Sequence, residues 1–377
     1  MINPTTYTQD LVRFDTTNPP GRERECVEFA ARTLESGGFR VDRQVFQNDR
    51  MNIVATFDGS DPDLLPLVLT GHLDTVPLGQ APWSHDPFGA EISDGKLYGR
   101  GASDMKAGVA AMISAGLAFA SRQGGRPRRG LQIILTSGEE TGCAGACHLV
   151  EHGHSLLTQA SGLIVGEPTA NAVSIAHKGA LFMSAKLKGV TAHSSQPELG
   201  DNAIYKAAKA VSRVEAYGFN RKPHPLLGAP TINVGMIKGG MNVNSVPDRA
   251  EFTIDIRTNA SAPHADFFDD IRNDLGDEVE LDTFTDMPAI STAPDDPLTL
   301  LALKACQSVL GASANGAATG LPFFTDASAL QPKLKCPTLI LGPGEPPTMH
   351  QTDEYCVVER IEQATEIYRR IVEEWCA

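Results

Sequence analysis

The sequence lacks any run of about 18 consecutive apolar residues, the length that a membrane-spanning helix requires. Its opening stretch, MINPTTYTQDLVRFDTTNPP, has neither a basic start nor an apolar segment, so we expect no secretory signal. The seven cysteines are scattered without a CxxC pair, which favours reduced thiols over a disulfide framework. Together these absences favour a cytoplasmic protein with no membrane partner.

Basic residues are in the minority, since 32 Lys and Arg stand against 46 Asp and Glu, and the formal net charge is −14. An acidic field repels phosphates, so nucleic acid is excluded as an expected partner. Neither a G-x-S-x-G motif nor a phosphate-binding P-loop occurs. At roughly 150 residues per domain, 377 residues predict two or three domains, with enough length to bury a large core.

Strand-like and helix-like segments alternate in the first half of the chain and again after residue 296. Such alternation is typical of parallel sheets covered by helices, so it predicts an α/β domain with a mostly parallel sheet. The expected strands are 51–57, 66–72, 131–137, 161–167 and 336–342, and the expected helices are 22–37, 104–122, 296–310 and 357–375.

Between these two parts the strands alternate between apolar and polar residues, as strands with one exposed face do. Strands are expected at 181–188, 231–238, 251–257 and near 278–284, with helices at 201–217 and around Phe267 and Ile271. The order β-α-β-β-α-β is the ferredoxin-like pattern. The sequence therefore predicts one domain made of residues 1–178 and 289–377, with a second domain inserted at residues 179–288.

Two details of the inserted domain follow from its apolar residues. The helix 201–217 would have one stripe bounded by Ile204, Ala208, Val211 and Glu215. The strand 231–238 would carry Ile232, Val234 and Met236 on one face, as the strand 251–257 carries Phe252, Ile254 and Ile256.

His72 and Asp74 lie where the expected strand 66–72 ends. In extended backbone, residues two apart point the same way, so the Asp74 carboxylate can reach the His72 ring. A carboxylate bonded to the far nitrogen of a metal-bound imidazole fixes its orientation. The alternative is that His72 caps a strand and Asp74 caps a turn.

Further acids and a histidine follow the other expected strands: Glu139 and Glu140 in SGEETG, Glu167 in GEPT, and His350 after GPG. Adjacent carboxylates repel each other unless a cation compensates, so one of the pair can bind metal while the other handles protons. Asp104, in GRGASDMKAG, is either a helix N-cap or a bridging carboxylate. This mixture of imidazole and carboxylate ligands beyond strand ends suits Zn²⁺ or a similar ion.

One other segment has metal-ligand spacing. His148 and His152 enclose the pattern H-x-x-E-H and would share one face of a helix. The alternative is a solvated helix end, since the segment does not follow an expected buried strand.

Together the motifs GHLDTVP, GRGASDMKAG, SGEETG, GEPT and a late GPG…H resemble those of the M20 family of di-zinc metallopeptidases and deacylases, in the same order and spacing. This family includes acetylornithine deacetylases, succinyl-diaminopimelate desuccinylases, aminoacylase-1 and glutamate carboxypeptidases. The resemblance covers essentially the whole chain and is greatest to acetylornithine deacetylases, through His177-Lys178-Gly179 among other features. It implies a zinc-peptidase-like catalytic domain with an inserted lid and dimerisation domain.

The resemblance also implies roles for individual residues. His72 and Glu167 would bind one metal ion, Glu140 and His350 the other, and Asp104 would bridge both. The two ions would be Zn²⁺, with Co²⁺ or Mn²⁺ as alternatives.

Three more roles concern residues beside these ligands. Asp74 would orient His72, and Glu139 would be the general base. The Asp104–Met105 peptide bond would be cis.

In the inserted domain, His193 in TAHSS would reach the active site of a partner subunit in a homodimer and help to polarise the scissile carbonyl. The resemblance places substrate contacts at Asn244, Arg257, Lys178 and Thr325. From the residues alone, His193 is an ordinary loop histidine, and Arg257 forms an ion pair with Asp255 or Glu251.

The implied activity is removal of the acyl group from an N-acyl amino acid, with Nα-acetyl-L-ornithine as the leading candidate. Glu139 would assist attack of a metal-bridging hydroxide on the amide carbonyl. The alternatives are a succinyl-diaminopimelate desuccinylase, a dipeptidase or carboxypeptidase, a non-catalytic member of the family, and a protease that uses His148 and His152.

Overall fold

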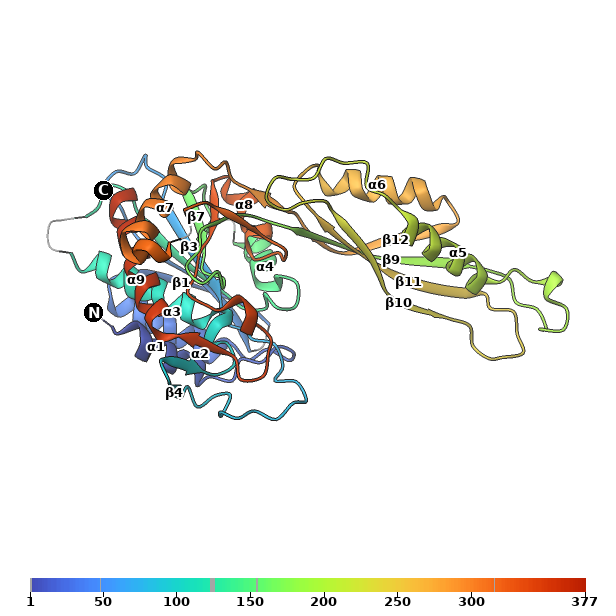
Figure 1. Cartoon of the computed structure of the whole chain (residues 1–377), viewed down its shortest axis with the longest axis horizontal. Helices are drawn as coiled ribbons and strands as arrows, with labels where there is room; N and C mark the ends of the chain where they lie inside the picture. The colour runs from blue at the N-terminus through green and yellow to red at the C-terminus, as the bar shows by residue number, and fades with distance from the viewer. Residues whose placement is uncertain (1, 48, 123–125, 154, 315) are drawn as a thin grey trace. The chain divides into compact units, whose positions relative to one another are not determined.

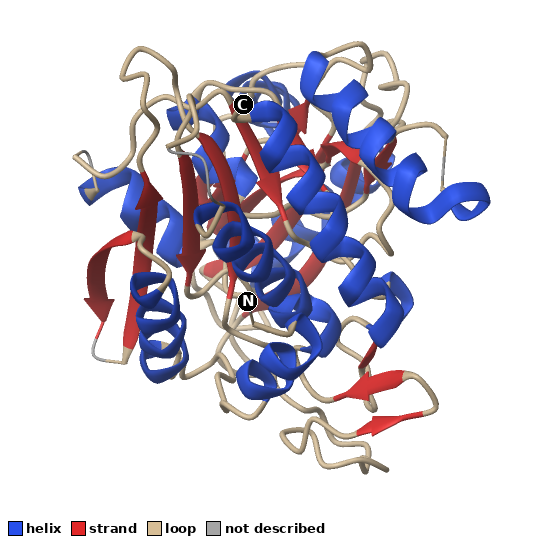
Figure 2. Ribbon diagram, turned by 90° about the vertical axis from the view of Figure 1, so that its left-hand side faces the viewer, coloured by secondary structure: helices blue, strands red, loops and turns tan. Residues whose placement is uncertain are grey.

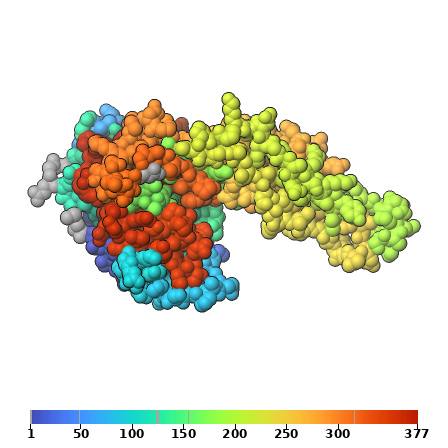
Figure 3. Space-filling view, viewed as in Figure 1, coloured from blue at the N-terminus to red at the C-terminus, as the bar shows by residue number. Residues whose placement is uncertain are grey.

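The computed structural model of the chain describes residues 2–47, 49–122, 126–153, 155–314 and 316–377. The chain forms two compact units. The first comprises Met1–Ala176, Ser291–Gly320 and Thr325–Ala377, and the second comprises His177–Ile290 with Leu321–Phe324. The first unit therefore combines both ends of the sequence, whose blue and red segments lie together in Figures 1 and 3.

The first unit contains a nine-stranded sheet with the strand order β1-β2-β6-β3-β7-β15-β8-β13, in which β14 pairs with β8. Its central strands β6, β3, β7 and β15 are parallel neighbours, which confirms the predicted mostly parallel sheet. All four are completely buried, as their apolar sequences require. The strands are β1 (Arg40–Gln47), β2 (Arg50–Phe57), β3 (Leu67–His72), β6 (Leu131–Thr136), β7 (Gly162–Val165), β8 (Ser174–His177), β13 (Ile290–Ser291), β14 (Thr319–Leu321) and β15 (Thr338–Ile340).

Helices cover both faces of this sheet, and several of them lie in front of its strands in Figure 2. Gly116 of α3 lies against Ile133 on one face of β6, whereas Thr136 on the other face bonds to Asp326 at the start of α8. The helices of this unit are α1 (Pro4–Val12), α2 (Arg24–Ser36), α3 (Ala107–Ala120), α4 (Ala144–His152), α7 (Pro297–Leu310), α8 (Ala327–Leu334) and α9 (Val358–Trp375). Within the described residues, no helix is both long and apolar enough to cross a bilayer.

The helix predicted over 104–122 begins three residues later than expected. Residues Ala102–Lys106 form an irregular turn in which Asp104 and Met105 have non-helical backbone angles. The Asp104–Met105 peptide bond is cis, as the resemblance implied. Asp104 therefore lies in a turn before α3 and not in the first turn of a helix.

A small three-stranded sheet was not predicted. It consists of β4 (Ile92–Ser93), β5 (Lys96–Tyr98) and β16 (Tyr355–Val357), in the order β16-β5-β4. Because Tyr355 pairs with Tyr98, the chain after His350 lies beside the turn that carries Asp104.

The second unit is a four-stranded antiparallel sheet with the strand order β10-β11-β9-β12. Buried side chains from both helices and from β9, β11 and β12 form its hydrophobic core, against which the partly buried Ile232 and Val234 of β10 pack. Along the chain it has the order β-α-β-β-α-β: β9 (Gly179–Lys188), α5 (Ala203–Ala216), β10 (Thr231–Gly239), β11 (Arg249–Thr258), α6 (His264–Leu275) and β12 (Val279–Met287).

The predicted buried stripe of α5 is wrong by one position. The helix buries Ala203, Ala207, Ala210 and Val214, while Ile204 is 37% exposed. The observed stripe is entirely apolar, whereas the predicted stripe ends in the charged Glu215. Small alanines allow the helix to approach the sheet closely, and this packing selects the observed stripe.

The predicted face of β10 is also wrong at Met236. A register shift between Val234 and Ile237 places Ile237, not Met236, opposite Phe252. An inserted bulge residue reverses the alternation beyond it, and alternation alone does not reveal where the insertion occurs. The predicted alternation of β11 is confirmed, since Phe252, Ile254 and Ile256 are buried.

Candidate metal centre

The carboxyl ends of three adjacent parallel strands carry most of the predicted ligands. His72 is the last residue of β3, Glu140 follows the end of β6, and Glu167 follows the end of β7. Because these strands are parallel neighbours, their ends meet at the same edge of the sheet. His350 comes from the loop after β15, and Asp104 from the turn before α3.

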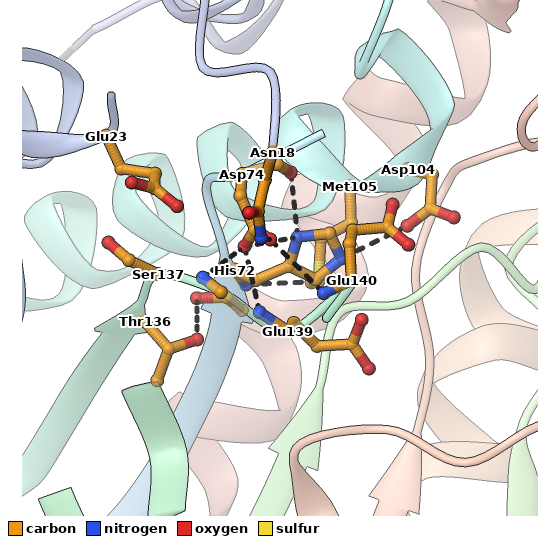
Figure 4. Close-up of polar contacts among 12 residues, drawn as sticks. Asn18, Glu23, His72, Asp74, Asp104, Met105, Thr136, Ser137, Glu139 and Glu140 are labelled. Carbon is orange, nitrogen blue, oxygen red and sulfur yellow. Dashed lines mark hydrogen bonds and ion pairs between the residues drawn. The ribbon is translucent and has the colours of Figure 1, made fainter. Parts of the chain in front are cut away.

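Asp104 lies between the two histidines. Its Oδ1 is 3.2 Å from Nε2 of His72, and its Oδ2 is 3.4 Å from Nε2 of His350. Each histidine also lies near one glutamate: Nε2 of His72 is 3.7 Å from Glu167 Oε1, and Nε2 of His350 is 3.2 Å from Glu140 Oε2. The five predicted ligands thus form two histidine–glutamate pairs with the Asp104 carboxylate between them. Figure 4 shows three of these residues, His72, Asp104 and Glu140.

The main-chain carbonyl of Asp74 lies closer to the His72 ring than its carboxylate does. Nδ1 of His72 is 3.0 Å from the Asp74 carbonyl oxygen and 3.5 Å from the nearer carboxylate oxygen. Hydrogen bonding of Nδ1 to this carbonyl leaves Nε2 directed at Asp104, as Figure 4 shows.

The Asp74 carboxylate binds the turn after β6. It accepts hydrogen bonds from the amides of Gly138 at 2.7 Å, Glu139 at 3.0 Å and Glu140 at 3.2 Å. The side-chain amide of Asn18 also donates to it at 2.9 Å (Figure 4). Asp74 therefore holds the turn that presents both glutamates, and Asn18 helps to hold Asp74.

The electrostatics of the centre favour a bound cation. Burial raises the pKa of Glu139, Glu140 and Glu167, and repulsion from neighbouring carboxylates raises each further. Burial also opposes ionisation of Asp104, but hydrogen bonds from His350 and His72 hold its pKa below the usual value. A divalent ion among these groups would stabilise their charged forms.

The donor atoms present fit a divalent metal ion. Within the described residues, ligand atoms of His72, Asp104 and Glu140 all lie within 4.8 Å of one another. Oε1 of Glu140 is buried and has no hydrogen-bond partner among the described residues, so it is available to a ligand. Imidazole nitrogens with carboxylate oxygens are a typical donor set for Zn²⁺ and similar ions.

His148 and His152 are not part of this convergence. Both lie on α4, of which His152 is the last residue, and the His148 ring stacks on Phe46 at 5.2 Å and lies 4.4 Å from the His152 ring. The group of metal-ligand side chains found in the described part of the chain does not include them.

The other predicted site residues of the inserted domain belong to the second unit. The Ser194 amide donates to the Asn244 carbonyl at 3.1 Å, so the His193 loop lies against the Asn244 loop. Arg257 forms an ion pair with Asp255 at 2.9 Å. The Lys178 ammonium donates to the Ala229 carbonyl at 3.0 Å.

Thr325 lies in the first unit and has no exposed surface. Its hydroxyl accepts the Ala327 amide at 3.1 Å. The next residue, Asp326, is also buried and accepts the Thr136 hydroxyl at the end of β6.

Sequence reasoning did not identify Asn18, Asp326 or Glu354 as residues of this centre. Glu354 is fully buried and accepts the Asp104 amide at 3.0 Å. Its spacing of four residues from His350 was the available signal, but it does not follow a predicted strand.

Comparison with known proteins gives consistent results. The model of peptidase family M20/M25/M40 matches residues 68–374. The chain is 31% identical to a succinyl-diaminopimelate desuccinylase of Methylobacterium radiotolerans, covering 97% of this chain and 95% of that protein. It is 30% identical to an acetylornithine deacetylase of Myxococcus xanthus, and the match covers 97% of this chain and 96% of that protein.

Two solved structures show the same fold. A metallo-carboxypeptidase of the M20 family from Sulfolobus solfataricus has a TM-score of 0.79 at 17% identity, with 99% of each chain covered. A dinuclear metal-binding M20 peptidase from Bacillus subtilis has a TM-score of 0.74 at 17% identity, covering 99% of this chain and 97% of that one.

Proposed function

Because the chain belongs to peptidase family M20/M25/M40, we propose that it is a two-metal amidohydrolase that removes the acyl group from an N-acyl amino acid. The observation that carries this proposal is the arrangement around Asp104, whose two carboxylate oxygens lie near His72 and His350, each with its own glutamate. The proposed ligands are His72 and Glu167 for one ion and Glu140 and His350 for the other, with Asp104 between them.

The proposed metal is zinc, with cobalt or manganese as alternatives. Two bound divalent ions would lower the pKa of a water molecule and polarise the amide carbonyl. Glu139 would accept the proton of that water and return it to the leaving amine. The Asp74 carboxylate would keep Glu139 in place through its backbone amide.

Nα-acetyl-L-ornithine is the leading candidate substrate, and an N-succinyl-diaminopimelate is the main alternative. The chain has nearly the same sequence identity to a relative of each kind, 31% and 30%, so sequence identity does not distinguish between the two substrates. Dipeptides are a further alternative. Arg257 and Lys178 are cationic and suit a substrate carboxylate. Asn244 is the other proposed substrate contact, whereas Thr325 has no exposed surface for a substrate to touch.

The proposed assembly is a homodimer formed through the second unit, in which His193 reaches the partner's active site. Strand β10 is an edge of the sheet, and Ile237 on it is 56% exposed. The proposed compartment is the cytoplasm, because all seven cysteines are free thiols.

The first experiment is amine release by the metal-loaded protein, with and without a chelator. The panel contains Nα-acetyl-L-ornithine, other N-acetyl amino acids, N-succinyl-LL-diaminopimelate and a few dipeptides. Chelator-sensitive release from one compound is the expected result and identifies the acyl group and the side chain. A protein that neither binds metal nor releases amine would contradict the proposal.

A further inference from the structure

Glu354 is a fully buried carboxylate that the proposed chemistry does not use. Each of its two carboxylate oxygens accepts two hydrogen bonds. Oε1 accepts the amides of Ser103 at 2.8 Å and Asp104 at 3.0 Å. Oε2 accepts the amide of Gly101 at 3.0 Å and the Arg100 guanidinium at 2.7 Å.

All four donors lie in residues 100–104, which lead into and begin the turn that presents Asp104 to the candidate metal centre. Asp104 itself has non-helical backbone angles, so regular helix hydrogen bonds do not determine its position. Gly101 has a φ of 84°, where a side chain would also meet Thr75 and Lys106. The carboxylate of Glu354, which is 250 residues away in the sequence, therefore caps this turn in place of a local residue.

The Ser103 hydroxyl connects the same turn to both sides of His350. It donates to the Tyr355 carbonyl at 2.6 Å, and it accepts the Glu345 amide at 2.8 Å. The Thr348 hydroxyl donates to the Tyr355 carbonyl at 3.2 Å. His350 lies between these attachments with a φ of 61°, a conformation that non-glycine residues keep only where the surroundings hold it.

We propose that Glu354 is a positioning residue which, together with Ser103, holds the backbone of Asp104 in register with His350 before metal binds. This inference rests on the ligand set proposed above. Both metal positions use Asp104, but only one also uses His350. The ion held by Glu140 and His350 should therefore depend more strongly on Glu354 than the ion held by His72 and Glu167.

The test is the Glu354→Gln variant, with metal content measured by titration into the metal-free full-length protein. Glutamine keeps the size of the side chain but replaces one acceptor oxygen by a donor, so at least one pair of hydrogen bonds is lost. We expect the affinity for the second ion to fall about 10- to 100-fold, the usual effect of losing a group that supports a ligand. The affinity for the ion held by His72 and Glu167 should fall less, because that position uses Asp104 but not His350.

The matched control is Glu23→Gln. Glu23 is also fully buried and pairs with a buried arginine, since its Oε1 lies 2.7 Å from Arg50 Nη2. This variant should lose thermal stability as Glu354→Gln does, but should still bind two ions. Equal loss of the second ion in both variants, or two tightly bound ions in Glu354→Gln, would overturn the proposal.

Two further measurements keep the proposal testable. Amide exchange in the metal-free protein should show protection of Gly101, Ser103 and Asp104 in the wild type and its loss in Glu354→Gln. If Glu354→Gln does not fold, Ser103→Ala removes the connection to the His350 loop and leaves the Arg100 pair intact. Wild-type binding of both ions by Ser103→Ala would then count against the proposal. If the wild type binds no metal, the ligand set is wrong, and amide exchange still tests the positioning role.

Discussion

Two buried carboxylates at the candidate metal centre bind backbone amides: Asp74 holds the turn of Glu139 and Glu140, and Glu354 holds the turn of Asp104. A carboxylate that accepts several amide hydrogen bonds fixes the positions of its donors. The proposed ligands are therefore held in place by residues that are not themselves proposed to bind metal. At the scale of single residues, the proposed reaction depends on individual side chains, so single substitutions test it.

Glu139→Gln should separate metal binding from turnover. The amide cannot accept a proton, so kcat should fall about 10²- to 10⁴-fold, while two ions remain bound. The measurements are steady-state kinetics on the preferred substrate and metal content by elemental analysis. Glu151→Gln, an exposed glutamate on α4, is the control and should retain wild-type kcat. Near-wild-type turnover in Glu139→Gln would reject its role as general base.

His177 should make stability depend on pH. Burial lowers its pKa from 6.5 to about 4. Between these values the unfolded chain binds a proton that the folded chain does not, so stability should fall as pH drops below about 6.5. When the pH falls from 7 to 5, the free energy of unfolding of the metal-free wild type should decrease by about 2 kcal/mol more than that of metal-free His177→Asn. Urea denaturation at both values measures this difference.

The control for this measurement is His152→Asn, because His152 is exposed. It should show the same pH dependence as the wild type. If the wild type and His177→Asn lose equal stability between the two pH values, His177 is not a neutral buried histidine.

At the scale of helices and strands, three of the proposed ligands come together because the parallel strands β3, β6 and β7 end at a common edge of the sheet. A helix packs closely against that edge. Helix α3 lies against the end of β7, where a Cβ atom on Gly108 would be only 2.1 Å from the Gly166 carbonyl oxygen. Glycine at this position allows the helix and the strand to approach. Glu167, a proposed ligand, is the next residue after Gly166, so this packing also influences the candidate metal centre.

Gly108→Ala should therefore destabilise the protein by about 1–3 kcal/mol, because α3 must move away from the β7 end. The metal affinity should fall as well, since Glu167 moves with that backbone. Gly218→Ala is the control, because a Cβ there has no neighbour within 4 Å. Thermal melts of both variants, with and without metal, give the comparison, and wild-type stability in Gly108→Ala would contradict the packing argument.

For the whole molecule, the predicted ligands all belong to the first unit, whereas His193, Asn244, Arg257 and Lys178 belong to the second. Apolar residues are exposed along one edge of the second unit: Ile204 and Tyr205 on α5, and Met236 and Ile237 on β10. An edge strand with unpaired backbone groups and apolar side chains is suited to pairing with another chain.

Ile237→Lys should convert the proposed dimer into a monomer of 40.2 kDa, because a charge on the β10 edge disfavours its burial. The control is Phe284→Lys on β12, the opposite edge strand, where Phe284 is 61% exposed. This variant should remain dimeric. Sedimentation velocity of the wild type, Ile237→Lys and Phe284→Lys measures their oligomeric states. A monomeric wild type would contradict the proposed role of His193 in a partner's active site.

The sequence by itself determined the parallel core and the residues that converge on Asp104. Buried strands are continuous apolar runs, and His72, Glu140 and Glu167 lie at or soon after the ends of such runs, so both are local features. Only the tertiary structure decided which stripe of α5 is buried, where β10 contains its bulge, and that Asp74 and Glu354 hold the two turns. These outcomes depend on packing and hydrogen bonds between residues far apart in the chain. No periodicity or spacing encodes such contacts, because their energies arise only once the chain is folded.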